Sequence, residues 1–262
     1  METIWTREGS VRDWIAQIAK DGNYTLTMMS RYSVRIKTTK LCVVISDRWV
    51  GEGLMHLLMR YRAHVRKRME DGLIDLSDDG DPEYSREGGS LTRSYRDAEE
   101  CDLSSAHATT LYQINGIDDW MHAKLQKYSK ESRLMIVGSL GSTKTITRYE
   151  SNSPVDDEEK TEPTKPVYEK ICRMTDRIMR ELMDVMGKDA YYYYWDAVYV
   201  RPGCSGKVRK YMADRGYRIK VKPARIKGIY GKIVTEDGRV YGGTVHEMSD
   251  YNNIMRMMEE AV

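Results

Sequence analysis

Apolar and polar residues alternate in three short segments near the start of the chain, at 24–28, 34–36 and 41–45. Alternation with many β-branched residues is typical of strands that bury one face. In residues 52–71 the apolar positions recur every three or four residues instead, which predicts an amphipathic helix. A similar pattern predicts a shorter helix within residues 1–22.

The same patterns continue through the rest of the chain, with one polar interruption. Residues 151–166 are acid-rich and contain proline, so we expect a connector without regular structure. Residues 167–186 place Ile171, Met174, Ile178, Leu182 and Val185 along one face of a long helix that ends at Gly187. The other expected elements are helices at 106–114, 118–137, 207–214 and 249–262, strands at 143–149, 217–221 and 224–234, and an Asp-Gly hairpin turn at 235–239.

Helices and strands in this mixed order predict an α+β fold. An acidic, turn-rich stretch over 71–87 is a natural place for the chain to divide. We therefore expect N-terminal strands and a basic helix in residues 1–83, and a second domain in residues 84–262.

Composition narrows the classes of protein. No run approaches the roughly 18 apolar residues of a membrane span, and residues 1–12 lack the basic-then-apolar order of a signal sequence. The four cysteines lie far apart with no CxxC pair, as free thiols do in a reducing compartment. We expect a cytoplasmic protein without membrane contact.

Charge is balanced over the whole chain, with 42 Lys and Arg against 40 acidic residues, but it is uneven locally. The expected helix at 52–71 is dense in cations, among them Arg60, Arg66 and Lys67. Such a face is either solvated or a contact for nucleic-acid phosphates. The sequence leaves both interpretations open.

Two aspartates stand in apolar surroundings. Asp102 ends a short strand, and two serines after it lead into a helix. Asp196 lies within the aromatic run at 191–200, which predicts a strand or tight hairpin. Because burying an unpaired carboxylate is costly, each residue fits a metal ligand. The simpler alternatives are a helix N-cap for Asp102 and an exposed turn for Asp196.

Cations follow the first aspartate along the chain. Lys124, Lys127, Lys130 and Arg133 recur every three residues in the expected helix at 118–137, close to one face. This row is either solvated or a binding face for a triphosphate.

Together these segments resemble the palm of family B DNA polymerases. The run Asp102-Leu103-Ser104-Ser105-Ala106-His107-Ala108 is similar to the first motif of that family, Asp-x-x-Ser-Leu-Tyr-Pro, and Gly88-Gly89 precedes it as a glycine pair does there. Residues 138–142 take the place of the second motif. Residues 192–200 are similar to the third motif, Tyr-x-Asp-Thr-Asp-Ser-Ile-Tyr-Val, and Lys227-Gly228-Ile229-Tyr230 looks like the strand that holds the primer.

The resemblance implies a palm-like antiparallel sheet backed by helices, a small N-terminal α/β region, and fingers reduced to a stub at about 115–142. It also implies a DNA-directed DNA polymerase-like nucleotidyltransferase with two Mg²⁺ or Mn²⁺ ions, held by Asp102, Asp196 and the main chain of Leu103. The implied nucleotide-binding residues are Leu103, Ser104, Ser105, His107, Lys130, Arg133, Gly138 and Ser139. The implied nucleic-acid-binding residues are Arg60, Arg66, Lys67, Lys227 and Tyr230.

Three hypotheses follow. The first is a minimal polymerase of viral or mobile-element type that replicates DNA, binds primer-template and nucleoside triphosphates in the host cytoplasm, and uses an additional subunit for thumb or processivity. The second is a palm without catalysis that binds nucleic acid or serves assembly, which the altered second motif favours. The third is an ordinary α+β domain with coincidental motifs. His107 stands where the family has a sugar-gating tyrosine, so the choice between DNA and RNA stays open. Tyr194 replaces the first aspartate of the third motif.

Overall fold

The structure is a computed structural model that describes residues 2–6, 23–30, 33–39, 41–46, 52–77, 85–151, 153–229 and 232–241. The chain forms two compact units. The first unit takes residues 1–63, 138–165 and 246–262, and the second takes 64–137 and 166–245. The expected helix at 249–262, the apolar stripe of the helix expected within 1–22, and Tyr230 lie outside the described residues. Of residues 1–22, only 2–6 are described, and they form a strand.

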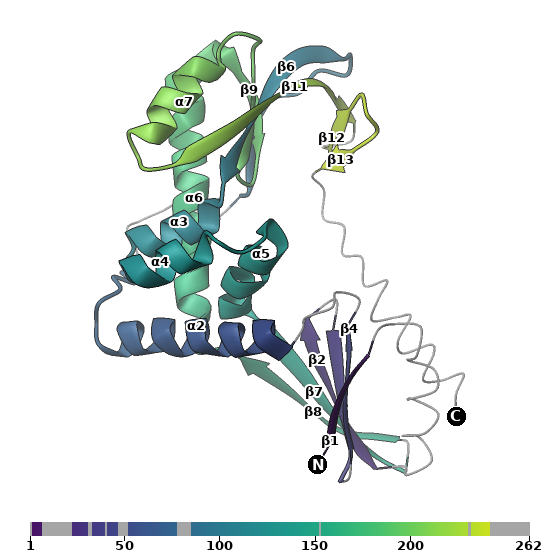
Figure 1. Ribbon diagram of the computed structural model, residues 1–262. Helices are drawn as coiled ribbons and strands as arrows, with labels where there is room; N and C mark the ends of the chain where they lie inside the picture. The colour runs from purple at the N-terminus through teal and green to yellow at the C-terminus, as the bar shows by residue number, and fades with distance from the viewer. Residues whose placement is uncertain are drawn as a thin grey trace. The chain divides into compact units, whose positions relative to one another are not determined.

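In the first unit, the described strands form one six-stranded sheet (Figure 1). The predicted strands at 24–28, 34–36, 41–45 and 143–149 are all present. Neighbouring strands are antiparallel except β1 and β4, which are parallel. Their order is β1 (Glu2–Thr6), β4 (Leu41–Ser46), β3 (Ser33–Lys37), β2 (Tyr24–Ser30), β7 (Thr143–Glu150) and β8 (Ser153–Thr161).

This sheet corrects the expected domain boundary at residue 83. Strand β7 pairs with β2, so residues 143–161 belong with the N-terminal strands rather than with the second domain. The rings of Tyr24 and Tyr149 stack across the pair, with centroids 4.6 Å apart. Tertiary contacts decide which strands pair when the strands are this distant in sequence. The local pattern of residues along the chain does not show such pairing.

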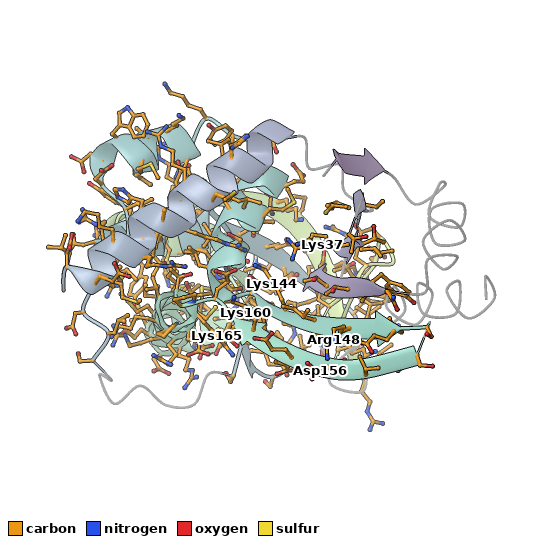
Figure 2. All side chains as sticks on the ribbon, turned by 90° about the horizontal axis from the view of Figure 1, so that it is seen from below. Lys37, Lys144, Arg148, Asp156, Lys160 and Lys165 are labelled. Atoms are coloured by element: carbon orange, nitrogen blue, oxygen red, sulfur yellow. The ribbon has the colours of Figure 1, made fainter. Side chains whose placement is uncertain are left out.

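The polar connector expected at 151–166 is also corrected, because residues 153–161 form strand β8. Every residue of β8 is exposed, so no apolar alternation marks it. Its order comes from main-chain pairing with β7, which places Lys144 opposite Lys160 and Arg148 opposite Asp156 (Figure 2). Four consecutive acidic residues at 156–159 make this edge a poor template for another strand.

Helix α2 (Glu52–Glu70) confirms the predicted helix at 52–71. Tyr61 and Val65 are fully buried, as the apolar stripe requires. The cations Arg60, Arg66 and Lys67 are exposed between these buried positions.

The second unit contains a seven-stranded antiparallel sheet and helices, which confirms the α+β class and the antiparallel sheet backed by helices. The strand order is β13 (Val240–Tyr241), β12 (Lys232–Thr235), β11 (Arg218–Ile229), β6 (Arg96–Ser104), β10 (Ala197–Val200), β9 (Ala190–Tyr194) and β5 (Glu87–Gly89). The helices are α3 (Ala106–Gln113), α4 (Asp119–Leu125), α5 (Lys130–Gly138), α6 (Lys165–Met186) and α7 (Ser205–Ala213), with a 3₁₀ turn at Gly187–Asp189. Another 3₁₀ turn, at Ser139–Gly141, belongs to the first unit.

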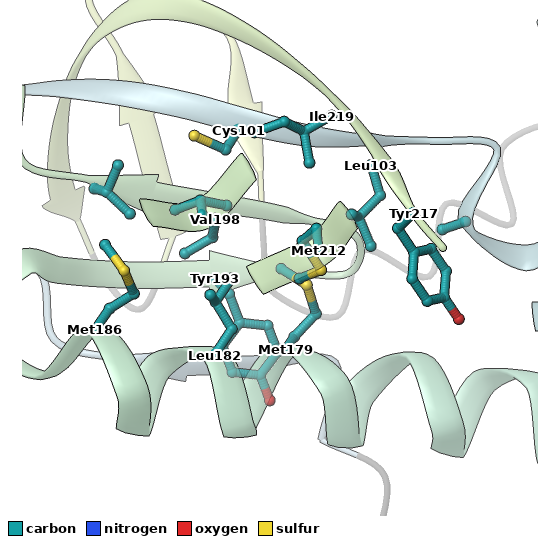
Figure 3. Packing of buried hydrophobic residues seen from close by; sticks show 13 residues of the cluster. Cys101, Leu103, Met179, Leu182, Met186, Tyr193, Val198, Met212, Tyr217 and Ile219 are labelled. Atoms are coloured by element: carbon teal, nitrogen blue, oxygen red, sulfur yellow. The ribbon is translucent and has the colours of Figure 1, made fainter. Parts of the chain in front are cut away.

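Apolar side chains cluster on both faces of this sheet, and the larger cluster lies on the face that packs against α6 and α7. From β6 through α6, β9, β10 and α7 to β11, the chain follows the β-α-β-β-α-β order of a split βαβ fold. Alternate residues of β6, Cys101 and Leu103, pack with Val198 of β10 against Met179 and Leu182 of α6 (Figure 3). The intervening residues Ala98, Glu100 and Asp102 project from the other face, which we call the Asp102 face.

Helix α6 and strand β11 each differ from expectation in one detail. Val185 is 67% exposed, and Met186 is buried in its place, because a straight stripe drifts around a 22-residue helix. Instead of the two strands predicted at 217–221 and 224–234, a single strand, β11, continues through Pro223 and ends at Ile229. Strand β12 then reverses direction and pairs antiparallel with β11.

The helix expected at 118–137 is divided into α4 and α5. Each part has its own polar cap at its start. The Asp118 carboxylate accepts a hydrogen bond from the Met121 amide at 2.8 Å, and the Ser129 hydroxyl accepts one from the Ser132 amide at 3.2 Å. Side chains that cap a helix compete with its continuation, which explains the break.

Within the described residues, no helix is long and apolar enough to cross a membrane.

The glycine pair before β6 allows two strands to approach closely. A Cβ atom on Gly88 would lie 2.6 Å from the Tyr193 ring, and one on Gly89 would lie 2.4 Å from the Tyr191 carbonyl oxygen. Gly89 also has φ +104°, which side-chain-bearing residues rarely adopt. Strand β5 can therefore pair with β9 only if both positions are glycine.

We predict that Gly89→Ala lowers the free energy of unfolding by about 2 kcal/mol or more, through strain and the clash with Tyr191. Urea denaturation measures the change. Gly206→Ala is the matched control, because no atom lies within 4 Å of its new methyl group in α7. Equal stability of the two variants would contradict the β5–β9 pairing.

Candidate active site

Asp102 lies near the end of β6, between two neighbouring strands. It stands opposite Ala197 of β10 and opposite Lys220 of β11. Its side chain is 25% exposed. The residue that caps α3 is Ser105, with φ 60°, so the alternative of Asp102 as an N-cap is wrong.

Asp196 lies in the turn of the β9–β10 hairpin. Tyr194 pairs with Ala197, so Trp195 and Asp196 form a two-residue turn. The Asp196 carbonyl oxygen accepts a hydrogen bond of 2.9 Å from the Leu103 amide. This bond continues the β6–β10 ladder into the turn and places Asp196 beside the residue that follows Asp102. Asp196 is half-buried, so it is not the exposed turn residue of the simpler alternative.

The charge of Asp102 affects the ionisation of Asp196. Burial, and then the negative charge of Asp102, raise the pKa of Asp196 from 3.8 to about 6. Burial also raises the pKa of Asp102, against the opposing effect of Lys130, whose Nζ lies 3.9 Å from the Asp102 Oδ2. The Lys130 ammonium acts on both acids. The structure thus brings together three sequence-predicted site residues, Asp102, Asp196 and Lys130.

Glu100 is a third acid of this region that the sequence analysis missed. It projects from the Asp102 face, is only 6% exposed, and its charge raises the pKa of Asp102. Its Oε1 lies 2.8 Å from the Lys222 Nζ, whereas its Oε2 has no hydrogen-bond partner within the described part of the chain. The spacing of Glu100 and Asp102, two residues apart in a strand, was the available signal, because alternate residues share a face.

Aromatic side chains surround the hairpin turn. Trp195 has φ 56°, a conformation that strongly favours glycine at the first residue of such a turn. The Trp195 amide donates to the Arg86 carbonyl oxygen at 2.7 Å, and the Arg86 guanidinium lies 4.7 Å from the Trp195 ring centroid. His107 lies within 6.4 Å of the Trp195 ring and 6.1 Å of the Tyr168 ring. Burial lowers the pKa of His107 to about 4, so the imidazole is neutral at pH 7.

The predicted cationic row does not form one face, because the chain turns between α4 and α5. The Lys124 Nζ lies 4.8 Å from the Trp120 ring centroid. The Arg133 guanidinium donates to the Tyr128 carbonyl oxygen at the start of α5. Of this row, Lys130 is the residue that an ion pair places beside Asp102.

The main-chain amide of Leu103, one of the implied nucleotide-binding residues, is already engaged in a hydrogen bond. That N–H already donates to Asp196, so it has no hydrogen left for a phosphate. Ser104 remains within β6, opposite Arg218, and Ser105 adopts a left-handed backbone before α3. Contacts of Ser104 and Ser105 with a nucleotide, and of the Leu103 carbonyl with a metal, remain predictions.

The other predicted residues are not brought to this site by any described contact. Gly138, Ser139 and Arg60 belong to the first unit. There the Ser139 carbonyl and hydroxyl oxygens each accept a bond of 3.1 Å from the Arg62 Nε, which is a structural use.

Two further predicted cations have partners in the second unit. The Lys67 Nζ lies 3.0 Å from an Asp71 carboxylate oxygen, and the Lys227 Nζ lies 4.4 Å from the Tyr95 ring centroid. Arg66 is exposed on α2. Binding of nucleic acid by Arg60, Arg66, Lys67 and Lys227 stays a prediction.

The donor set suits a hard divalent cation. Among the described residues, no group of three or more His, Cys, Asp or Glu side chains could enclose a metal ion. Mg²⁺ needs fewer protein ligands, because it commonly uses one or two carboxylates and completes its shell with water and substrate phosphates. Two carboxylates that repel each other in a half-buried site fit this mode of binding for Mg²⁺ or Mn²⁺.

We predict that Mn²⁺ binds more tightly as the pH rises through about 6, because the proton held by Asp196 competes with the cation. The metal-free protein should show the opposite trend in stability. Its free energy of unfolding falls between about pH 4 and pH 6, because the folded state holds this proton longer than the unfolded state. Calorimetric titration across this range measures the affinity.

Asp196→Asn should remove both pH dependences. The control is Asp214→Asn, at the exposed end of α7. A wild-type Mn²⁺ affinity that does not change between pH 5 and pH 7 would exclude Asp196 as a ligand.

We also predict that Trp195→Gly keeps the fold but weakens Mn²⁺ binding by about tenfold, because it removes the contacts that orient Asp196. Glycine suits the positive φ at this position, so denaturation should show no loss of stability from the turn itself. The control is Trp120→Ala, because Trp120 is a half-exposed tryptophan that also contacts a cation, in its case Lys124. Unchanged Mn²⁺ affinity in Trp195→Gly would show that the ring does not position Asp196.

Comparison of the chain with protein-family models, with curated proteins and with solved structures finds no match. The catalytic hypothesis rests on the geometry of β6 and the β9–β10 hairpin.

Proposed function

We propose that the protein is a template-dependent nucleotidyltransferase, a minimal DNA polymerase-like palm. The observation that carries the proposal is the placement of Asp102 on β6 beside Asp196 in the β9–β10 turn, where the charge of Asp102 raises the pKa of Asp196. Within the described part of the chain, Lys130 is the cation whose charge lowers the pKa of both acids. An acid on the first strand of a βαββαβ fold, beside a second acid in the central hairpin, suits the binding of two metal ions.

In this proposal the chain's residues divide the work. Asp102 and Asp196 hold the two divalent cations. The ions, when bound, supply activation of the 3′-hydroxyl and stabilise the charge on the pyrophosphate that leaves. Lys130, 64% exposed and 3.9 Å from Asp102, is placed to offset the negative charge of the triphosphate. His107, neutral and half-buried beside Trp195, is placed to contact the nucleoside.

The expected partners are primer-template DNA and nucleoside triphosphates. His107 is smaller than the tyrosine of the resembled motif, so exclusion of ribonucleotides is expected to be weaker. An additional subunit that supplies thumb or processivity is a further expected partner. A cytoplasmic site of action, that of a host if the protein is viral, is part of the same proposal.

A second candidate is a palm that binds nucleic acid or serves assembly without catalysis. The altered second motif favours it. Ser139 and Ser142, which lie in that segment, accept hydrogen bonds from Arg62 within the first unit, so their side chains have a structural use.

Primer extension with Mg²⁺ or Mn²⁺ tests the two candidates. We predict that the wild type extends a primed template and that Asp102→Asn or Asp196→Asn lowers the rate by at least about a hundredfold, because a metal ligand is lost. Asp214→Asn should leave the rate unchanged. Parallel reactions with deoxy- and ribonucleotides measure the selectivity at His107.

Each other outcome has a clear meaning. Extension that survives Asp196→Asn excludes this residue as a metal ligand and contradicts the mechanism. A wild type that binds DNA but never extends the primer supports the second candidate.

A further inference from the structure

Strand β11 carries three exposed cations at alternate positions, Arg218, Lys220 and Lys222. In the antiparallel pair with β6 they stand directly opposite Ser104, Asp102 and Glu100. Directly opposite residues of two paired strands project from the same face. The three cations therefore lie in a row on the Asp102 face, whereas Ile219 and Val221, between them, turn toward the core.

The simplest interpretation of this row is cross-strand pairing that stabilises the sheet. Lys222 fits it, because its Nζ lies 2.8 Å from the Glu100 Oε1. Lys220 fits it in part, because its charge lowers the pKa of Asp102. Arg218 does not fit it, because the residue opposite it is Ser104.

Metal binding changes the charge balance of this face. If Asp102 and Asp196 hold divalent cations, their charges are no longer free to offset nearby lysines. Arg218, Lys220 and Lys130 then leave a strong positive field, which attracts a polyanion. Residues two apart in a strand are about 6.4–6.8 Å apart, a spacing similar to that of successive phosphates along an extended nucleic-acid strand.

We propose that Arg218, Lys220 and Lys222 bind successive phosphates of the nucleic-acid strand whose end enters the site at Asp102 and Asp196. This assignment rests on the proposed function and names a strand-binding surface for it. Glu100 weakens the outermost contact, because it neutralises part of the charge of Lys222.

The salt dependence of DNA binding tests the assignment. The probe is a fluorescent primer-template oligonucleotide in Ca²⁺ without nucleotides, measured by anisotropy over a range of salt concentrations. Arg218→Gln and Lys220→Gln should each weaken binding severalfold and make the slope of log affinity against log salt shallower by about 0.9. The double variant should lose about twice that slope.

Two further variants sharpen the test. Arg225→Gln is the matched control on the same strand, because this arginine is already held by Asp97 at 3.3 Å and Glu236 at 2.8 Å, so its slope should equal that of the wild type. Lys222→Gln should weaken binding, whereas Glu100→Gln should tighten it, since an acid is removed from the face. Weakening by Glu100→Gln would contradict the assignment.

If the row only stabilises the sheet, Lys220→Gln lowers the free energy of unfolding and leaves the salt slope at the wild-type value, which overturns the proposal. The assay involves no turnover, so the two proposals fail separately. If the wild type extends primers but the variants keep the wild-type salt slope, the proposed function stands and the assignment of the β11 cations fails. If the wild type never extends primers but the variants change the slope, the β11 cations still form a nucleic-acid-binding surface and the proposed function fails.

Discussion

The antiparallel pairing of β6 with β10 is the constraint on which the candidate site depends. It places Asp102 of β6 beside the hairpin turn that contains Asp196, and the hydrogen bond from the Leu103 amide to the Asp196 carbonyl extends the pairing into that turn. Burial, and then the negative charge of Asp102, raise the pKa of the Asp196 carboxyl group. Burying two carboxylates near each other lowers the stability of the fold, and a bound cation would offset this cost.

Both faces of the same sheet bury apolar side chains, and the candidate site lies on the Asp102 face. One face packs Leu103, Val198 and Met179 into a dry core. The chain contains no Phe, and tyrosines supply much of the core bulk. Their hydroxyl groups need partners when buried, and the structure provides them. Tyr193 donates to Asp176 at 2.8 Å, and Tyr217 lies 2.8 Å from the Thr110 hydroxyl. These bonds tie strands to helices at defined positions, so the core also sets the register that the other face needs.

The β9–β10 hairpin turn contributes both to packing and to the candidate site. Trp195 occupies a backbone conformation that glycine would adopt at less cost, and Arg86, also at positive φ, holds it through a main-chain bond and its guanidinium. Strain that is retained beside a candidate ligand is consistent with a requirement for rigidity there. The neutral His107 next to the Trp195 ring gives the site an uncharged side, opposite in character to the cations of β11.

Local patterns along the chain predict the α+β class, most helices and strands, and the two candidate aspartates, because hydrophobic periodicity and an acid in an apolar run are local signals. The remaining features depend on contacts between segments that are distant in sequence. Strand β8 has no apolar face, so pairing with β7 alone orders it. The caps at Asp118 and Ser129 divide a helix whose cations looked continuous. Glu100 and Lys220 became neighbours of the site only when β6, β10 and β11 were in register, since pairing over such distances depends on packing that no local pattern records.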